Sequence, residues 1–270
     1  MMKQKVLFVT QEITPYLPES EMSLIGRHLP QGIQEKGKEI RTFMPRFGSI
    51  NERRNQLHEV IRLSGMNLIL DDFDHPLIIK VASIQSARLQ VYFIDNEDFF
   101  YRKGTVKNKE GEEFEDNGKR AIFFARGVLE TVKKLCWSAE IVHVHGWFSA
   151  FVPLYLKKSY IDDPLFNDLK IIYSIYEDDF KQPLSDKIMD TAMFEGIEKK
   201  DLEKLKHPDF INLNKIAIDN SDAVIYGSKN IHPELKQYVQ DKNLPVLKYQ
   251  DPENFVDAYS DFYDKILKEE

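Results

Sequence analysis

The sequence predicts an α/β fold in which a doubly wound parallel sheet carries helices on both faces, with a β-hairpin or meander insertion. Short apolar runs such as VLFVT at 6–10 are typical of strands that are covered on both faces. Segments with apolar residues at helical spacing lie between these runs, and the connections are short. Strands that alternate with helices in this way form parallel sheets.

The first third of the chain begins with the strand at 6–10 and a helical pattern at 21–35. Gly37 follows this pattern, at a position where glycine commonly ends a helix. The run EIRTFMP at 39–45 is expected to be a second strand. The block at 57–94 contains the strand-like runs EVIRL, LIIKVAS and LQVYFID without helical periodicity between them. We therefore expect a hairpin or meander in this block.

The rest of the chain continues the alternation. The stretch at 117–135 repeats apolar residues at helical spacing, and IVHVH at 141–145 is the next expected strand. After it we expect, in order, a helix at 148–158, a strand at 170–175, a helix at 212–219, a strand at 222–228, a helix at 232–241, a strand at 245–249 and an amphipathic helix at 253–269.

The composition is that of an ordinary soluble globular protein, with 42% hydrophobic and 30% charged residues among 270. The net charge of −7 gives no basic surface, so neither nucleic acid nor a membrane is an expected partner. The single cysteine, Cys136, excludes an internal disulfide and fits a reducing compartment. The N-terminal apolar run is too short for a signal peptide, and we expect a cytoplasmic protein.

Ligands of such sheets bind beyond the carboxyl ends of the strands, where the strand order reverses. The residues that follow the strand-like runs at 6–10, 141–145, 170–174 and 223–227 are therefore the first candidates for function. Two polar and charged stretches, 101–117 and 178–208, are either lids over this crevice or surface loops. Both interpretations stay open.

Several segments carry a family signature: VLFVTQEITPY, LPQGIQEKGKEIRTFMPRFGSI, VYFIDNEDFF and FFARGVLETVKKLCWSAEIVHVHGWFSAFVPLYLK. In this order they resemble the N-terminal domain of bacterial glycogen synthases and plant starch synthases, the family-5 glycosyltransferases, over most of residues 4–158. The resemblance is looser from residue 170 onward. It implies the Rossmann-like N-terminal domain of a GT-B enzyme. It also implies transfer of glucose, with retention, from ADP- or UDP-glucose to the non-reducing end of an α-1,4-glucan. No cofactor is expected.

The loop after the first strand departs from the family. The family reads Lys-Thr-Gly-Gly-Leu, whose lysine and glycines meet the phosphates of the donor. This chain has at those positions Pro18, Glu19, Ser20, Glu21 and Met22. Glycines let backbone N–H groups approach a phosphate, whereas carboxylates repel it. We therefore expect a degenerate donor loop that is a poor site for a sugar nucleotide.

The stretch VHVHGWFS at 142–149 departs as well. The family writes His-x-His-Asp-Trp-His here, and its last histidine contacts the transferred sugar. In this chain Gly146 stands at the aspartate position and Phe148 at the last histidine, and a phenyl ring cannot hydrogen-bond a sugar hydroxyl. In the next strand the family's Thr-Val-His-Asn becomes Ser-Ile-Tyr-Glu at 174–177, so another imidazole is lost.

The end of the chain is the third departure, because a GT-B synthase has a second domain that supplies most contacts to the donor. We expect a single domain over 1–270, with a Rossmann-like core at 1–240, a last strand and helix at 241–270, and no donor-binding C-terminal domain. The final FVDAYSDFYDKILKEE resembles the helix with which GT-B chains return to their N-terminal domain. Excision of a donor domain near 241–245 is the hypothesis that connects these observations.

No catalytic residue is assigned from this sequence. The candidates for lining the cleft and contacting glucan are Glu12, Tyr16, His143, His145, Trp147, Phe148, Tyr176 and Glu177. Structural interpretations stay open beside these roles, namely hydrogen bonds for Glu12 and the histidines, and helix–sheet packing for Trp147 and Phe148. The two histidines share one face of their strand, but no other residue has the spacing of a further ligand, so no metal site is expected.

Three functions are compatible with the sequence. The favoured one is a catalytically inactive glycogen/starch synthase-like domain that binds α-1,4-glucan or maltooligosaccharide, or that associates with another glycogen enzyme. Without a donor domain nothing would stabilise the leaving nucleoside diphosphate. The alternative is one half of a split glucosyltransferase whose donor domain comes from another chain. The third is a synthase that is active on its own, against which both altered motifs argue.

Overall fold

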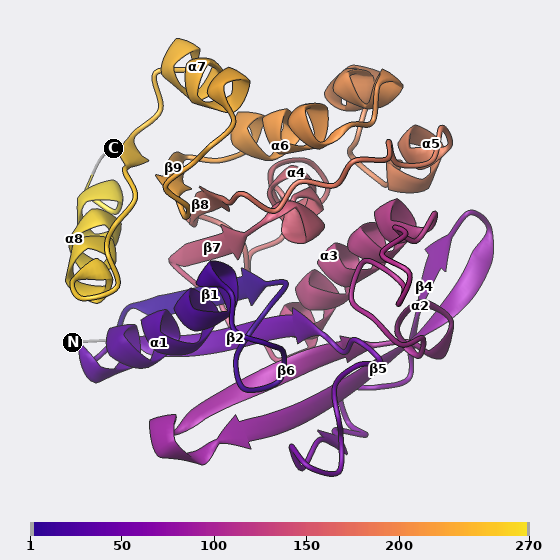
Figure 1. Ribbon diagram of the computed structural model, residues 1–270, viewed down its shortest axis with the longest axis horizontal. Coiled ribbons are helices and arrows are strands. Elements are labelled where there is room, and N and C mark those ends of the chain that lie inside the picture. The colour runs from indigo at the N-terminus through magenta and orange to yellow at the C-terminus, as the bar shows by residue number, and fades with distance from the viewer. Residues whose placement is uncertain (1–2, 269–270) are drawn as a thin grey trace.

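A β-sheet runs through the middle of the molecule in the computed structural model, which describes residues 3–268 (Figure 1). Its strands are β1 (Lys5–Thr10), β2 (Glu39–Pro45), β3 (His58–Glu59), β4 (Met66–Leu70), β5 (Phe73–Ile84), β6 (Leu89–Asp95), β7 (Ile141–His145), β8 (Lys170–Ile175), β9 (Ala223–Tyr226) and β10 (Val246–Leu247). Across the described residues the order is β10-β9-β8-β7-β1-β2-β6-β5-β3, and β4 pairs with β5 beside this path.

The strands from β10 to β6 are parallel, whereas β5 is antiparallel to its neighbours β6, β4 and β3. The chain starts in the middle of the sheet, builds outward through β2 and β6, and then returns to the other side of β1 with β7. The predicted doubly wound α/β fold is confirmed. The reversal places the topological switch point between β1 and β7, so their carboxyl ends mark the crevice in which such sheets bind ligands.

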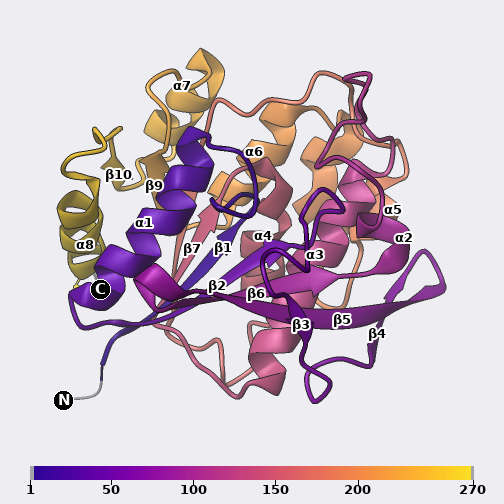
Figure 2. The same ribbon diagram turned by 60° about the horizontal axis from the view of Figure 1, so that its bottom comes forward.

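Helices cover both faces of the sheet (Figures 1 and 2). They are α1 (Glu21–Glu35), α2 (Glu97–Phe100), α3 (Asn117–Lys134), α4 (Phe151–Lys158), α5 (Ile188–Ala192), α6 (Phe210–Asp219), α7 (Pro233–Asp241) and α8 (Phe255–Ile266), with 3-10 turns η1 (Gln85–Ala87), η2 (Trp147–Ser149) and η3 (Lys199–Lys206). α1 and α8 contact each other on one face, while α3, α4 and α6 pack in sequence on the other. No helix between residues 3 and 268 is long and apolar enough to cross a membrane.

The block at 57–94 contains the predicted hairpin or meander, because β4, β5 and β6 pair in antiparallel succession. β6 pairs with β2 in parallel, so this block continues the main sheet. Of the expected run at 59–63 only one residue joins a strand, and β4 was not predicted. Asp71 and Asp72 form its turn with positive φ angles of 52° and 64°. The β4–β5 hairpin projects from the end of the sheet (Figure 2).

In the C-terminal third, some elements match the predicted helices and strands and others differ from them. α8 covers most of the helix expected at 253–269, of which residue 269 lies outside the described range. β10 is only two residues long, although a strand was expected over 245–249. The polar stretch at 178–208 contains the short helices α5 and η3, which bury Ile188, Leu202 and Leu205 against the body of the protein. These sparse apolar residues were too widely spaced to reveal a helix in the sequence.

Candidate functional site

The crevice at the switch point is bordered by the carboxyl ends of β1, β7, β8 and β9 and by the N-terminus of α1. Four connections hold these elements together, and each involves a polar side chain that follows a strand or begins the helix. They run from Ser20 to Glu12, from Ser228 to Glu21, from the backbone of Glu177 to Ser228, and from the backbone of Trp147 to Asp178.

The loop at 18–22 is a helix cap in the structure. Ser20 is the N-cap of α1: its Oγ accepts from the Ser23 backbone N–H at 3.0 Å, and the Ser20 N–H donates to Ser23 Oγ at 2.8 Å. This reciprocal capping satisfies two of the backbone groups that a helix end would otherwise expose. Ser20 Oγ also donates to Glu12 Oε2 at 2.6 Å, so a carboxylate is fixed directly beside the helix N-terminus.

The neighbouring Glu21 is held from the far side of the crevice. Its Oε2 accepts from Ser228 Oγ, after β9, at 2.6 Å, and the same Ser228 oxygen accepts from the Glu177 backbone N–H at 3.2 Å. Glu19 and Glu177 are exposed. The helix N-terminus, which favours an anionic ligand, therefore faces carboxylates of the protein itself.

Gly146 and Met22 fit each other across the crevice. Gly146 has a φ of +73°, and a Cβ atom at this position would lie 2.5 Å from Met22 Cε and 2.8 Å from Asp178 Oδ2. A side chain at position 146 would therefore displace both neighbours. The space that the family's aspartate would need is filled by Met22, from the altered loop, and by the Asp178 carboxylate, which follows β8.

Asp178 is a residue that the sequence analysis missed. Its Oδ2 accepts from the Trp147 backbone N–H at 3.4 Å, and its buried Oδ1 has no hydrogen-bond partner within residues 3–268. Burial raises the pKa of Asp178 to about 7, and the nearby charge of Glu12 adds to this shift. The only signal in the sequence was one aspartate in the acidic run after β8, which looks like an exposed loop.

The carboxylates of the crevice carry no counter-charge. Glu12, Glu21, Glu177, Asp178 and Asp179 form no ion pair in the part of the chain that the structure describes. Two unit charges about 4 Å apart interact by about 4 kcal/mol near a protein surface. A nucleoside diphosphate at this place would meet repulsion from several carboxylates.

The two histidines of β7 lie in the core rather than at the crevice surface. His143 is fully buried and His145 is 1% exposed, and their ring centroids are 3.8 Å apart. His143 Nδ1 is hydrogen-bonded to the Tyr263 hydroxyl of α8 at 2.5 Å, and its Nε2 to Ser174 Oγ at 2.7 Å. Burial lowers the pKa of His143 well below its ordinary value and that of His145 to about 3, so both rings are neutral at pH 7.

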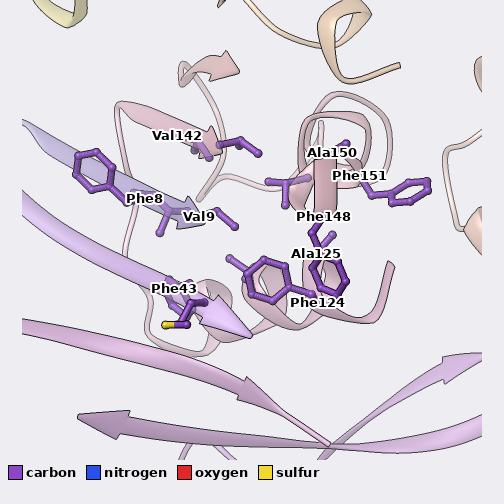
Figure 3. Close-up of a cluster of buried hydrophobic side chains, with 14 of the residues drawn as sticks. Phe8, Val9, Phe43, Phe124, Ala125, Val142, Phe148, Ala150 and Phe151 are labelled. Carbon is purple, nitrogen blue, oxygen red and sulfur yellow. The ribbon is translucent and has the colours of Figure 1, made fainter. Parts of the chain in front are cut away.

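The candidate aromatic residues are also buried. Trp147 and Phe148 are at most 1% exposed, and Figure 3 shows Phe148 in one cluster with Phe124, Phe43 and Val9. Tyr176 is hydrogen-bonded to His145 Nδ1 at 2.9 Å. Tyr16 lies edge-on to Phe93, its ring centroid 4.9 Å away, and burial raises its pKa to about 12. None of these four rings offers a face to a sugar in this conformation.

Arg120 is a second residue that the sequence analysis missed. It is fully buried in α3, donates to the Phe99 carbonyl and to Asn117 Oδ1, and leaves its Nη2 without a partner in the described chain. Burial lowers its pKa to about 9. Four phenyl rings surround the guanidinium, those of Phe47, Phe100, Phe114 and Phe148, with ring centroids 5.2–5.7 Å from Cζ. Phe148 thus contributes to a cation–π cage.

A cavity of about 1200 Å³ lies between the two stretches that were considered as lids. Its walls include Glu115, Lys119 and Lys181, and the lining is mostly polar. Glu113 joins the stretches, because its carboxylate accepts from the backbone N–H groups of Lys181 and Gln182 at 2.9–3.1 Å. Burial alone would raise the pKa of Glu113, but these hydrogen bonds and Lys107 hold it below its ordinary value.

No group of three or more His, Cys, Asp or Glu side chains between residues 3 and 268 is arranged to hold a metal ion.

The residues that the sequence predicted for the site divide into two sets by their burial. Glu12, Glu177 and the loop residues Pro18, Glu19 and Glu21 reach the crevice or the solvent. The histidines and the aromatic residues lie behind them and support the strands.

Comparisons with known proteins give a consistent result. The family model of the starch synthase catalytic domain matches residues 5–247. Glycogen synthase of Pelodictyon phaeoclathratiforme is 31% identical over 242 residues, which cover 87% of this chain and 48% of that protein. Glycogen synthase of Chlorobium limicola is 36% identical over 173 residues, covering 64% of this chain and 35% of the relative. The chain spans about half the length of the curated relatives it matches, or less.

A solved structure shares the fold. The catalytic domain of starch synthase IV from Arabidopsis thaliana, bound to ADP and acarbose, superposes with a TM-score of 0.73. The match covers 93% of this chain and 52% of that one, at 17% sequence identity. At this identity the likeness concerns the arrangement of strands and helices.

Proposed function

The chain belongs to the starch synthase catalytic domain family of glycosyltransferases, and on that premise we propose that it binds α-glucan without transferring glucose from a sugar nucleotide on its own. In this proposal residues 1–270 form one domain that binds glucan. It consists of a Rossmann-like core at 1–240 and a last strand and helix at 241–270. The free Cys136 supports a reducing compartment such as the cytoplasm.

The observation that carries the proposal is the pair of hydrogen-bonded carboxylates at the start of α1. Glu12 is held by Ser20, and Glu21 by Ser228, each at 2.6 Å. A diphosphate needs backbone N–H groups and positive charge at this place. Here the N–H of Ser23 is already bonded to the Ser20 cap, and carboxylates occupy the approach. These features disfavour binding of the sugar nucleotide. They also leave the domain without the positive charge that would stabilise a leaving diphosphate.

A neutral polar ligand has a different requirement. Glucan hydroxyls both donate and accept hydrogen bonds, and a mixed set of carboxylates and lysines can serve them without a net-charge match. The cavity of about 1200 Å³ between 107–119 and 181–191 offers such a set, with Glu115, Lys119 and Lys181 on its walls. Its two walls belong to segments that follow β6 and β8 along the chain, and this is the site that we propose for glucan.

Two measurements on the purified protein test the proposal. We expect no glucose transfer from ADP-glucose or UDP-glucose to glycogen, and measurable turnover with either donor would refute the inactive domain. Transfer that appears only after another polypeptide is added would favour the two-chain glucosyltransferase instead. For glucan binding, electrophoresis in a gel that contains glycogen should show retardation of the protein.

Variants locate the glucan site. Glu115→Ala and Lys181→Ala replace exposed side chains of the cavity, and each should weaken glycogen binding about 2- to 10-fold, as expected for the loss of one or two hydrogen bonds. Lys200→Ala and Glu203→Ala, which are exposed on η3, serve as matched controls. Equal retardation of all four variants would show that the cavity is not the glucan site.

A further inference from the structure

A groove of about 760 Å³ runs along the outer face of α1, between this helix and the segment at 249–257 that leads into α8. Unlike the crevice and the cavity, its walls are mainly apolar. The apolar side chains that line it are Leu24, Ile25, Tyr249, Pro252, Phe255 and Val256. None of them belongs to the glucan site proposed above.

The C-terminal half of α1 fixes α8 and closes one wall of the groove. A Cβ atom at Gly32 would lie 2.4 Å from Val256 Cγ1, so glycine permits this close approach of the two helices. Lys36 Nζ pairs with Asp257 Oδ1 at 2.6 Å at the same end. Toward the N-terminus of α1 the apolar face stays open, and Leu24 is 38% exposed.

The residues of α1 that face the groove recur at steps of three and four. They are Glu21, Leu24, Ile25, His28, Gln31, Gly32 and Glu35. This spacing places them in one stripe along the helix, the arrangement against which a second helix packs. α1 contains 15 residues, which at about 1.5 Å per residue give a stripe of about 22 Å. The groove therefore matches a helix of about four turns.

Carboxylates stand at both ends of the stripe. Glu21 accepts a hydrogen bond from Ser228, and Glu35 accepts one from Gln31 at 2.8 Å, but neither forms an ion pair within the described range 3–268. The other charges on the groove, Lys36 and Asp257, neutralise each other. Burial and the charge of Arg27 lower the pKa of His28, so that this ring is neutral at pH 7. The rim is thus negative around an apolar floor.

We propose that the α1–α8 groove binds an amphipathic helix of a partner protein, with its apolar face on Leu24 and Phe255 and with lysine or arginine side chains facing Glu21 and Glu35. Helices that dock in grooves place apolar anchors at three- and four-residue steps. The apolar lining of the groove from α1 and from 249–256 can receive such anchors. Ion pairs at both ends set the register of the partner helix along α1. The interaction is independent of glucan binding, because the two sites share no residue.

The probe is a fluorescein-labelled model peptide of about four helical turns, with leucine on one face and lysine at both ends and on the other face. Its binding to the purified protein is followed by fluorescence anisotropy at physiological ionic strength. We expect saturable binding that weakens about tenfold or more with Glu21→Lys, Glu35→Lys and Leu24→Glu. A second peptide with glutamate in place of lysine should not bind.

Matched controls separate the groove from general attraction to an acidic protein. Glu203→Lys changes the net charge as Glu21→Lys does, and Ile61→Glu introduces a charge at a side chain that is 84% exposed outside the groove. Both should bind the lysine peptide like the unchanged protein. Equal weakening by controls and groove variants would overturn the proposal. So would self-association of the protein that Leu24→Glu abolishes, because a second copy would then be the occupant.

Discussion

The Asp178 carboxyl group combines burial, a neighbouring carboxylate and an oxygen without a hydrogen-bond partner among residues 3–268. Its pKa of about 7 lies above the ordinary value of 3.8. The folded state therefore holds this proton between about pH 4 and 7, while the unfolded chain has released it. Asp178 favours the folded state below pH 4, and this contribution is lost as the pH rises through 7.

Replacing Asp178 by asparagine tests this linkage. The amide keeps an acceptor for the Trp147 N–H and cannot ionise, so Asp178→Asn should stabilise the protein by about 1 kcal/mol at pH 8, or about 2–4 °C in Tm. The gain should shrink at pH 5, where the original side chain is protonated. Thermal unfolding at both pH values measures it, and an equal gain at the two would contradict the raised pKa.

The buried histidines predict that the protein loses stability in acid, which is the opposite pH dependence to that of Asp178. Their folded pKa values lie below the unfolded value of 6.5, so their contribution is present above pH 6.5 and is lost as the pH falls toward 3. In that range each buried histidine lowers the free energy of unfolding by about 1.4 kcal/mol per pH unit. His145→Gln should reduce this slope by about that amount in urea titrations below pH 6. An unchanged slope would show that His145 titrates equally in both states.

Residue roles were only partly accessible from the sequence. The pairing of His143 and His145 on one face follows from strand periodicity, and the altered residues at 18–22 are visible in the sequence. Asp178 and Arg120 were not recognised, because their environments are built from distant segments. The Asp178 carboxylate lies beside Gly146 and accepts from the Trp147 N–H, and the guanidinium of Arg120 lies among phenylalanines of four different segments. Burial of Phe148 and Trp147 likewise depends on helices that fold over them.

At the scale of elements, the Glu113 carboxylate ties the loop before α3 to the segment after β8. Glu113→Ala removes the acceptor of two backbone N–H groups at 181–182. We expect faster hydrogen exchange in 106–116 and 179–187, by about 10-fold for a loss of about 1–2 kcal/mol. Glu110→Ala, on the same loop and exposed, is the control and should change neither segment. Unaltered exchange in Glu113→Ala would mean that other contacts hold the loops together.

The packing of α8 predicts a second effect at this scale. Tyr263 of α8 is hydrogen-bonded to His143 of β7, and Tyr263→Phe leaves a ring nitrogen of His143 unsatisfied in the core. The free energy of unfolding should fall by about 1–3 kcal/mol. Tyr226→Phe removes a partly exposed hydroxyl that makes no hydrogen bond in the described chain and should cost far less. Equal stabilities in urea would show that this contact contributes nothing.

Elements with strong local signals were predictable, and those set by tertiary pairing were not. β1 and α1 have the predicted bounds within one residue, since an apolar run and a Ser20 cap define them locally. β4 depends on a turn at Asp71 and Asp72 and on pairing with β5, and β10 shortens to two residues because only those pair with β9. The contact between α8 and β7 joins residues 120 positions apart.

At the scale of the whole molecule, charge and surface type separate three regions. The crevice at the switch point is acidic and bridged by hydrogen bonds, and the cavity between 107–119 and 181–191 is polar with both signs of charge. The α1–α8 groove, which shares Glu21 with the crevice, is mainly apolar. The family fold is retained around a crevice whose electrostatics disfavour phosphate. This contrast is the basis for our proposal that the domain binds glucan rather than a sugar nucleotide.

Isothermal titration of the purified protein with ADP-glucose tests this claim most directly. The carboxylates Glu12 and Glu21 predict no saturable heat up to millimolar donor, whereas a maltooligosaccharide injected under the same conditions should bind. Saturable binding of ADP-glucose at micromolar concentration, weakened by Ser20→Asp at the helix cap, would place the diphosphate at the start of α1 and contradict the account.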